Sequence, residues 1–232
     1  MAKMKVVQCW DDGINNDVRL TGILRKYGAK ATFNLNPGWM GDKAVPDRWA
    51  THADGWSHNG FIPGKLSRRD IAEVYAGFEV ASHCWKHEVA GSVPDSEWIK
   101  AAVDARKFLE DIVQRPCRGF AWPCGVDTPA TVALLRENGF AYGRSTRNTF
   151  DATACPEPLA LATNCHFQAR DFWQRYEKAK ETGLFYFWGH SYEMYHYDEM
   201  WAHFEETIKF ITEDPDAEWA NVIDIVPLLK QP

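Results

Sequence analysis

The sequence of 232 residues has no run of 18 apolar residues, and its first residues, Met-Ala-Lys-Met-Lys, contain no apolar signal region. The first absence argues against a membrane-spanning helix. The second favours a cytoplasmic protein, although prior removal of an export signal would leave the same pattern. The six cysteines form no C-x-x-C pair. We therefore expect small buried thiols in a reducing compartment rather than a disulfide framework.

An excess of positive charge is also missing, because 26 Lys and Arg residues face 32 Asp and Glu residues, for a net charge of −6. Nucleic-acid binding needs a basic footprint, so a nucleic-acid partner is not expected. Internal repeats, low-complexity tracts and domain linkers do not occur either. We predict one domain over residues 1–232 with a loop-rich insertion at residues 37–66; no feature indicates an oligomeric state.

The chain is organised around an apolar stretch, residues 5–10, that stops on Asp11, Asp12 and Gly13. This stretch is typical of a buried strand, and α/β folds keep their chemistry at the carboxyl ends of such strands. Neighbouring Asp side chains at a strand end diverge. One can bind a metal while the other stays free as a base.

Apolar runs alternate with segments of helical periodicity along the rest of the chain. This alternation predicts a single-domain distorted (β/α) barrel of about seven strands, with an open doubly wound sheet as the alternative. Further strands are expected at residues 30–36, 78–84, 118–122, 140–145, 159–164, 184–188 and 220–223. Helices are expected at residues 17–27, 67–75, 96–116, 128–139, 171–183 and 197–211.

Polar clusters follow several of these strands, and a barrel would bring them together on one face. His83 and His87 are four residues apart, so on a helical turn both imidazoles would lie on one side. Joined to one carboxylate of the Asp pair, they form a set that suits zinc with an open coordination position. Such a metal supports hydrolysis of an amide or ester. Zinc is the expected metal, and other divalent transition metals are possible.

With these motifs in family order, the chain resembles the polysaccharide deacetylases of the NodB-homology type, carbohydrate esterase family 4. The first family motif, Asp-Asp-Gly after an apolar strand, corresponds to Asp11-Asp12-Gly13, and the second, His-x-x-x-His, to His83 and His87. The third looks like Ala121-Trp-Pro-Cys-Gly125, and the last looks like Trp188-Gly-His190.

The resemblance implies a metal-dependent hydrolase that removes acetyl groups from an amino sugar or other carbohydrate. It implies that Asp11 is the general base and His190 the general acid. The implied oxyanion donor is the backbone N–H of Cys124. The implied metal ligands are Asp12, His83 and His87.

Two departures from the family pattern matter. The third motif has Ala121 where the family has an arginine, so another residue must brace Asp11. Arg144, which ends the next predicted strand, is the first candidate, and Arg118 is the second. The Asp-x-x-Asp-Trp motif that orients the catalytic histidine is not found. Glu193 either orients His190 or meets the substrate, or it is a solvated helix-start residue.

Aromatic residues next to the motifs form either a floor for a sugar ring or part of the core. The candidate substrate contacts are Trp10, Trp85, Trp122, Pro123, Trp188, Tyr192, Glu193 and His166. Two other functions stay open: an allantoinase-like hydrolase of a small non-sugar C–N bond, and a carbohydrate-binding relative without catalysis. The presence of all five proposed catalytic and metal-binding side chains argues against the second.

Overall fold

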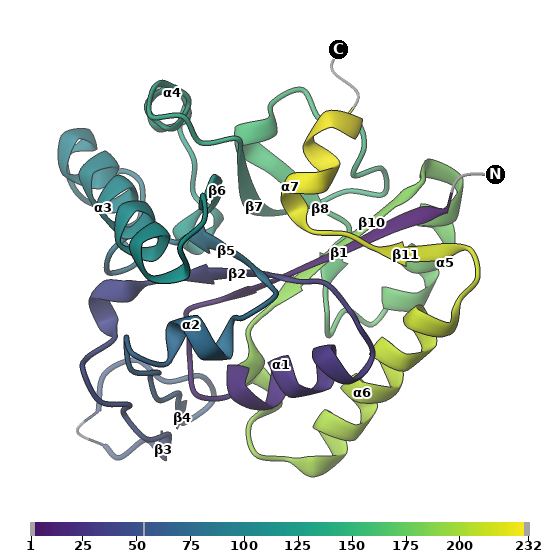
Figure 1. Cartoon of the computed structure of the whole chain (residues 1–232), viewed down its shortest axis with the longest axis horizontal. Coiled ribbons are helices and arrows are strands. Elements are labelled where there is room, and N and C mark those ends of the chain that lie inside the picture. Colours follow the sequence, from purple (N-terminus) through teal and green to yellow (C-terminus); the bar gives the residue numbers. More distant parts are fainter. Residues whose placement is uncertain (1–2, 53, 230–232) are drawn as a thin grey trace.

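A parallel sheet that curls into a nearly closed barrel forms the centre of the protein (Figure 1). The computed structural model describes residues 3–52 and 54–229. The sheet runs in the order β8-β7-β6-β5-β2-β1-β10-β9, and β11 pairs with β1 beside this path. The strands are β1 (Met4–Asp11), β2 (Thr32–Leu35), β5 (Glu79–Ser82), β6 (Gly119–Ala121), β7 (Tyr142–Asn148), β8 (Leu161–Thr163), β9 (Cys165–His166), β10 (Leu184–Gly189) and β11 (Ala217–Trp219).

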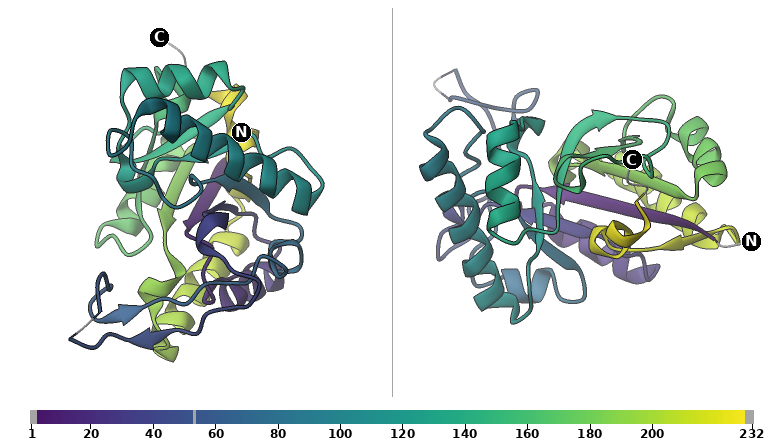
Figure 2. Two further views of the ribbon diagram at one scale, coloured as in Figure 1. Left: turned by 90° about the vertical axis from the view of Figure 1, so that its left-hand side faces the viewer. Right: turned by 90° about the horizontal axis from the view of Figure 1, so that it is seen from above.

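Helices surround this sheet, as Figures 1 and 2 show. The predicted (β/α) barrel is therefore confirmed, with eight strands on its main path. No helix in the described ranges is both long and apolar enough for a membrane span. The α-helices are α1 (Asp17–Lys26), α2 (Ile71–Val74), α3 (Asp95–Val113), α4 (Pro129–Glu137), α5 (Phe172–Thr182), α6 (Asp198–Glu213) and α7 (Val222–Ile225). The 3-10 helices are η1 (Pro37–Trp39), η2 (Pro123–Gly125), η3 (Pro158–Ala160), η4 (Ser191–Met194) and η5 (Val226–Leu228).

The two ends of the sheet path are joined by one buried residue, Asn164, which lies between β8 and β9. Its backbone N–H donates to the Tyr186 carbonyl at 2.6 Å, and its side-chain oxygen accepts from the Tyr186 N–H at 2.7 Å. The side-chain amide donates to the carbonyls of Thr149 and Phe150, both at 3.3 Å. Asn164 therefore supplies hydrogen bonds where the strand ladder is interrupted.

Strand β1 lies at the middle of the sheet and pairs with β2, β10 and β11. Successive side chains of a strand point to opposite faces. Trp10 therefore lies on the helix-facing side, against Phe167 and Phe204, at centroid distances of 5.0 and 5.3 Å. Asp11 has the opposite orientation, toward the interior of the barrel. The alternation separates a core residue from a polar one at adjacent positions.

Residues 37–66 contain one short antiparallel pair, β3 (Arg48–Trp49) and β4 (Phe61–Ile62), and project from one side of the barrel (Figure 2). Arg48 anchors part of this segment through two bonds to the Asp54 carboxylate, of 2.6 and 2.7 Å. The described residues of this segment contain little other regular structure.

Three local predictions were wrong. The helix expected at residues 67–75 is restricted to α2, because Ser67 and Asp70 form a side-chain-bonded turn before it: the Ser67 N–H donates to the Asp70 carboxylate. The strand expected at residues 220–223 is replaced by β11 and α7. Asn221 and Asp224 form a capping box there, which favours a helix start over an extended chain. The third wrong prediction is the helical turn expected to bring His83 and His87 together, which is absent at residues 83–87 and is described with the active site.

Candidate active site

A cavity of about 890 Å³ opens at the carboxyl ends of the barrel strands. It brings together side chains from β1, β7 and β10, from the turns after β5 and β6, and from residues 37–66. Convergence of strand ends explains why residues more than a hundred positions apart share one cavity. The lining residues are Asp11, Asp12, Trp39, Trp56, Ile62, Pro63, Lys65, His83, His87, Trp122, Cys124, Arg144, Thr146, Trp188, His190 and Tyr192.

Asp12, His83 and His87 form a group whose potential ligand atoms all lie within 4.8 Å of one another. Asp12 Oδ1 is buried and has no hydrogen-bond partner among the described residues, and it lies 3.9 Å from His83 Nε2. A buried carboxylate oxygen without a donor is costly unless a cation satisfies it. Two imidazoles and a carboxylate fit a divalent transition metal.

The protonation of His83 is compatible with metal binding. Its Nδ1 lies 2.8 Å from the Ala121 carbonyl, which can only accept, so Nδ1 carries the proton and Nε2 is the free ligand atom. Burial lowers the pKa of His83 to about 4. The ring is therefore neutral at pH 7, as a ligand must be.

His83 and His87 are not brought together by a helix, contrary to the sequence-based prediction. Residues 84–86 form a turn, and Cys84 at its start and His87 just after it have φ values of 61° and 60°. Asp12 also has a positive φ, of 82°. Left-handed backbone at non-glycine residues costs free energy and clusters at functional sites. Here it turns both imidazoles toward Asp12, with ring centroids 4.7 Å apart.

Asp11 is held by two donors inside the barrel. Arg144 Nη2 lies 2.5 Å from both carboxylate oxygens, and Asn34 Nδ2 donates to Oδ1 at 2.7 Å. The predicted first candidate for bracing Asp11 thus contacts it, and Arg144 is only 1% exposed. Burial raises the pKa of Asp11, but the guanidinium outweighs it and holds that pKa well below its usual range.

Glu193 links the side chains of His190 and His166. Its Oε1 lies 3.3 Å from His190 Nδ1, and its Oε2 lies 2.8 Å from His166 Nε2. His166 Nδ1 accepts the Gln168 backbone N–H at 3.2 Å, so Nε2 carries the proton that is donated to Glu193. These three side chains also form a group of metal-ligand type. The His166–Glu193 contact is a hydrogen bond, whereas His190 Nδ1 lies at ion-pair distance from Glu193 and has no hydrogen bond among the described residues. We interpret the group as an ion pair whose carboxylate is fixed by His166.

The carboxylates around His190 keep its imidazole protonated at neutral pH. Burial lowers the pKa of this imidazole, but the carboxylates of Glu193, Asp12 and Asp11 raise it to about 9. His190 Nε2 lies 3.8 Å from Asp11 Oδ2. A proton donor and an ionised acceptor therefore face each other across the cavity.

Cys124 lies in the turn η2 that follows β6, and its left-handed φ of 55° bends the chain at the cavity wall. Gly125 permits the bend, because a Cβ there would lie 2.1 Å from Thr146 Oγ1. The preceding Trp122 fixes the turn through bonds to Arg144 and Leu159 carbonyls. Five of the six cysteines are buried as expected, whereas Cys124 is exposed.

The four motif tryptophans divide into two pairs. Trp122 and Trp188 line the cavity, and Trp188 Nε1 is buried without a partner in the described part of the chain. Trp10 is fully buried, and Trp85 packs on Phe108 outside the cavity lining. The expectation that Trp10 and Trp85 contact a sugar is therefore not met.

The other candidate substrate contacts also differ in position. Tyr192 lines the cavity and stacks on His190 at a centroid distance of 4.8 Å. Pro123 is buried and lies outside the lining, as do His166 and Glu193, which bond to each other. His166 and Glu193 are therefore placed behind His190 rather than against the cavity.

Sequence reasoning missed several residues of the cavity. Lys65, Trp39 and Trp56 come from residues 37–66, whose density of tryptophan and glycine was the available signal. Trp39 stacks on His87 at 5.4 Å. Asn34, the partner of Asp11, could have been recognised as a polar residue inside an apolar strand.

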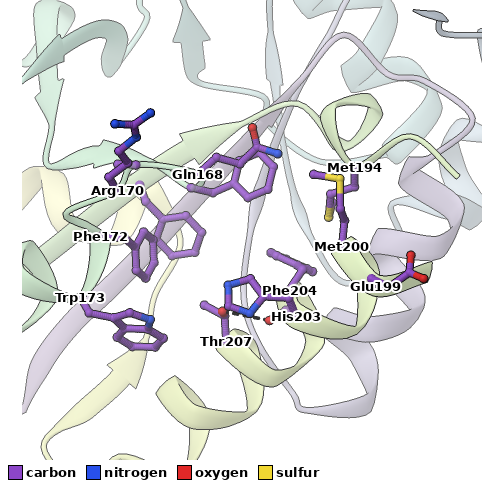
Figure 3. A pocket seen from close by; sticks show the side chains of 13 residues that line it. Gln168, Arg170, Phe172, Trp173, Met194, Glu199, Met200, His203, Phe204 and Thr207 are labelled. Atoms are coloured by element: carbon purple, nitrogen blue, oxygen red, sulfur yellow. Dashed lines mark hydrogen bonds between the residues drawn. The ribbon is translucent and has the colours of Figure 1, made fainter. Parts of the chain in front are cut away.

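A second cavity, of about 660 Å³, lies between the β9–α5 connection and α6 (Figure 3). Apolar side chains such as Phe172, Met200 and Phe204 form much of its lining, with Arg170 and Glu199 also present. It contains none of the proposed catalytic or metal-binding residues. We therefore place the chemistry in the cavity at the strand ends.

Comparisons with known proteins show the family and the fold of this chain. The polysaccharide deacetylase family model matches residues 1–143. A search of curated proteins finds no significant match. Among solved structures, a family 4 acetyl xylan esterase from Clostridium thermocellum, in complex with a cobalt ion, is 16% identical with a TM-score of 0.55, covering 98% of this chain and 93% of that chain.

A polysaccharide deacetylase-type protein from Mycobacterium smegmatis is also 16% identical, with a TM-score of 0.63 over 99% of this chain and 91% of that chain. A Streptococcus pyogenes deacetylase in complex with acetate is 18% identical with a TM-score of 0.47; the match covers 60% of this chain and 55% of that chain. Since the family model matches more than half of the sequence, the chain belongs to the polysaccharide deacetylase family and is a hydrolase of the deacetylase type.

Proposed function

We propose that this protein is a divalent-metal-dependent deacetylase that removes acetyl groups from an amino sugar or other carbohydrate. Asp12, His83 and His87 are its proposed metal ligands, and zinc is the proposed metal. The observation that carries the proposal is the buried, unpartnered Oδ1 of Asp12 facing the free Nε2 of His83. When bound, such a cation polarises an acyl carbonyl and lowers the pKa of water to about 7.

Asp11 is the proposed general base. Arg144 and Asn34 keep its carboxylate ionised and fixed in orientation, so it can accept a proton from the attacking water. A carboxylate with a low pKa is a weak base. A divalent cation held by the three proposed metal ligands would lower the pKa of the water enough for such a weak base to serve.

His190 is the proposed general acid. Its protonated ring lies between the carboxylates of Glu193 and Asp11 and donates a proton to the leaving amine or alcohol. His166 is a proposed positioning residue, because its bond fixes the Glu193 carboxylate. The backbone N–H of Cys124 is the proposed donor to the oxyanion; loss of one such donor typically costs about 10²–10³ in rate.

The test is acetate release from a panel of N-acetylated and O-acetylated sugars, with protein stripped by a chelator and then restored with zinc. We expect metal-dependent acetate from at least one sugar, and loss of that activity in Asp11→Asn and His190→Ala proteins that still bind zinc. Allantoin belongs in the panel. Its turnover without acetate release would replace the sugar assignment, and zinc binding without any turnover would favour a non-catalytic relative.

A further inference from the structure

Lys65 is held at the cavity by paired backbone. Its N–H and C=O exchange bonds of 3.0 and 2.8 Å with Val45, and it also forms a bridge with Ile14, just after the Asp-Asp-Gly turn. The preceding Gly64 allows this close approach, because a Cβ there would lie 2.0 Å from the Val45 carbonyl oxygen. The side chain of Lys65 therefore enters the cavity from a fixed strand-like position.

The ammonium group of Lys65 has no hydrogen bond and no ion pair within 4.0 Å among the residues that the structure describes. Its contact is the face of Trp39, whose centroid lies 4.8 Å from Nζ. Burial lowers the pKa of Lys65, and the carboxylates that oppose this effect from farther away are Asp12 and Asp17. Asp17 is already bonded to the hydroxyls of Tyr75 and Ser191, at 2.6 and 2.5 Å.

The charges around the cavity favour an anionic ligand once the proposed metal is bound; this step rests on the proposed function. Asp11 is paired with Arg144, and Glu193 with His190. Asp12 then faces a divalent cation as well as Lys65, so two cationic centres share one carboxylate. Aromatic walls keep the local dielectric low and strengthen the attraction of this positive excess for an anion.

We propose that Lys65 binds a carboxylate of the substrate, so that the preferred substrate is an acetylated sugar acid rather than a neutral acetylated sugar. Arg144 is paired with Asp11 and the protonated His190 with Glu193, so Lys65 is the Lys or Arg side chain of the described cavity lining that has no carboxylate partner within 4.0 Å. One charge matches a carboxylate better than a phosphate dianion. Trp39 and Trp56, from the same segment, supply apolar surface for the sugar ring.

The test compares N-acetylglucosamine, its 6-carboxylate and the methyl ester of that acid. For the wild type, we expect kcat/KM to be about tenfold to a hundredfold higher for the acid than for its ester, the range of a charge-assisted hydrogen bond. Lys65→Met should remove this preference, and Lys65→Arg should retain part of it. Lys43→Met, at an exposed lysine of the same segment, is the matched control and should keep the preference.

A second measurement does not depend on turnover. Calorimetry on the zinc-restored protein, with the deacetylated forms of the acid and the ester as ligands that cannot turn over, should show that the acid binds at least tenfold more tightly than the ester, with the difference lost in Lys65→Met. Equal binding of acid and ester, or an equal loss of both in Lys65→Met, would overturn the proposal. If no sugar releases acetate, the deacetylase assignment fails, and calorimetry still decides the role of Lys65.

Discussion

The single carboxylate of Glu193 contacts three groups: the imidazoles of His166 and His190, and the His190 backbone N–H at 3.0 Å. Although burial raises the pKa of Glu193, the two histidines lower it to about 2. The carboxylate is therefore ionised at neutral pH. We propose that it takes the place of the missing aspartate motif, from a position three residues after the histidine it contacts.

Replacing this carboxylate should shift the pH dependence of catalysis. In Glu193→Gln, burial of His190 is no longer opposed by the nearest negative charge, so its pKa falls from about 9. His190 must be protonated to act as an acid. We therefore expect the alkaline limb of kcat/KM to move to lower pH by about one unit or more.

The pH dependence of folding stability should change in the same variant. A raised His190 pKa stabilises the fold fully below pH 6.5, and this contribution is lost as pH rises through about 9. Glu193→Gln should flatten this part of the stability profile. Glu199→Gln, at an exposed residue of α6, is the control. An alkaline limb at its wild-type position in Glu193→Gln would remove Glu193 from the mechanism.

The seam, which is the place between β8 and β9 where the strand ladder is interrupted, depends on Asn164. The residues before and after Asn164 belong to strands at the two ends of the sheet, so its side chain supplies bonds that a continuous ladder would otherwise make. The adjacent Arg175 Nη1 also donates to the Asn164 carbonyl, at 3.0 Å. This arrangement ties the seam to α5.

Asn164→Ala should therefore destabilise the protein more than an ordinary asparagine substitution. It leaves the buried Tyr186 N–H and the Thr149 and Phe150 carbonyls without this partner, and each such buried group costs about 1–3 kcal/mol. We expect a loss of about 2–3 kcal/mol in urea unfolding. Asn138→Ala, which removes a bond to the Leu134 carbonyl at the end of α4, is the control. Equal effects in the two proteins would show that the seam is not held by Asn164.

For the whole molecule, metal binding should be visible as stability. The proposed ligands come from the ends of β1 and β5 and the turn that follows, which are brought together only in the folded state. A ligand that binds the folded state alone stabilises it by about 4 kcal/mol at a thousandfold excess over its Kd. Chelator treatment should therefore lower the Tm, and zinc should restore it.

Asp12→Asn provides the contrast. It removes the ligand oxygen charge, so zinc should no longer raise the Tm. The metal-free stability should also fall at neutral pH, because burial raises the pKa of Asp12 but Lys65 and the neighbouring histidines outweigh it and hold that pKa below its usual value; the zinc-induced shift is therefore measured against each protein's own metal-free Tm. An undiminished zinc-induced Tm shift in Asp12→Asn would contradict the ligand assignment.

The amino-acid sequence by itself determined the alternation of strands and helices, and hence the barrel, because periodicity and strand-end punctuation are local properties. It also determined the motifs, since Asp11-Asp12-Gly13, His83 with His87, and His190 are recognisable by residue type and spacing. Local patterning failed where side-chain bonds compete with periodicity, as in the Asn221–Asp224 capping box.

Only the tertiary structure decided between the candidates for bracing or orienting each proposed catalytic residue. Asn34 reaches Asp11 from β2, which pairs with β1, whereas Arg144 reaches it across the barrel interior from β7, with β6, β5 and β2 between the two strands along the sheet; no spacing in the sequence encodes these distances. Whether Trp10 points toward the surrounding helices or into the barrel depended on which residues pack against each face of β1. Lys65 became a candidate binding residue only when its ammonium group was found to have no ion pair within 4.0 Å among the described residues, because the pairing of charges depends on distances in space and not on sequence order.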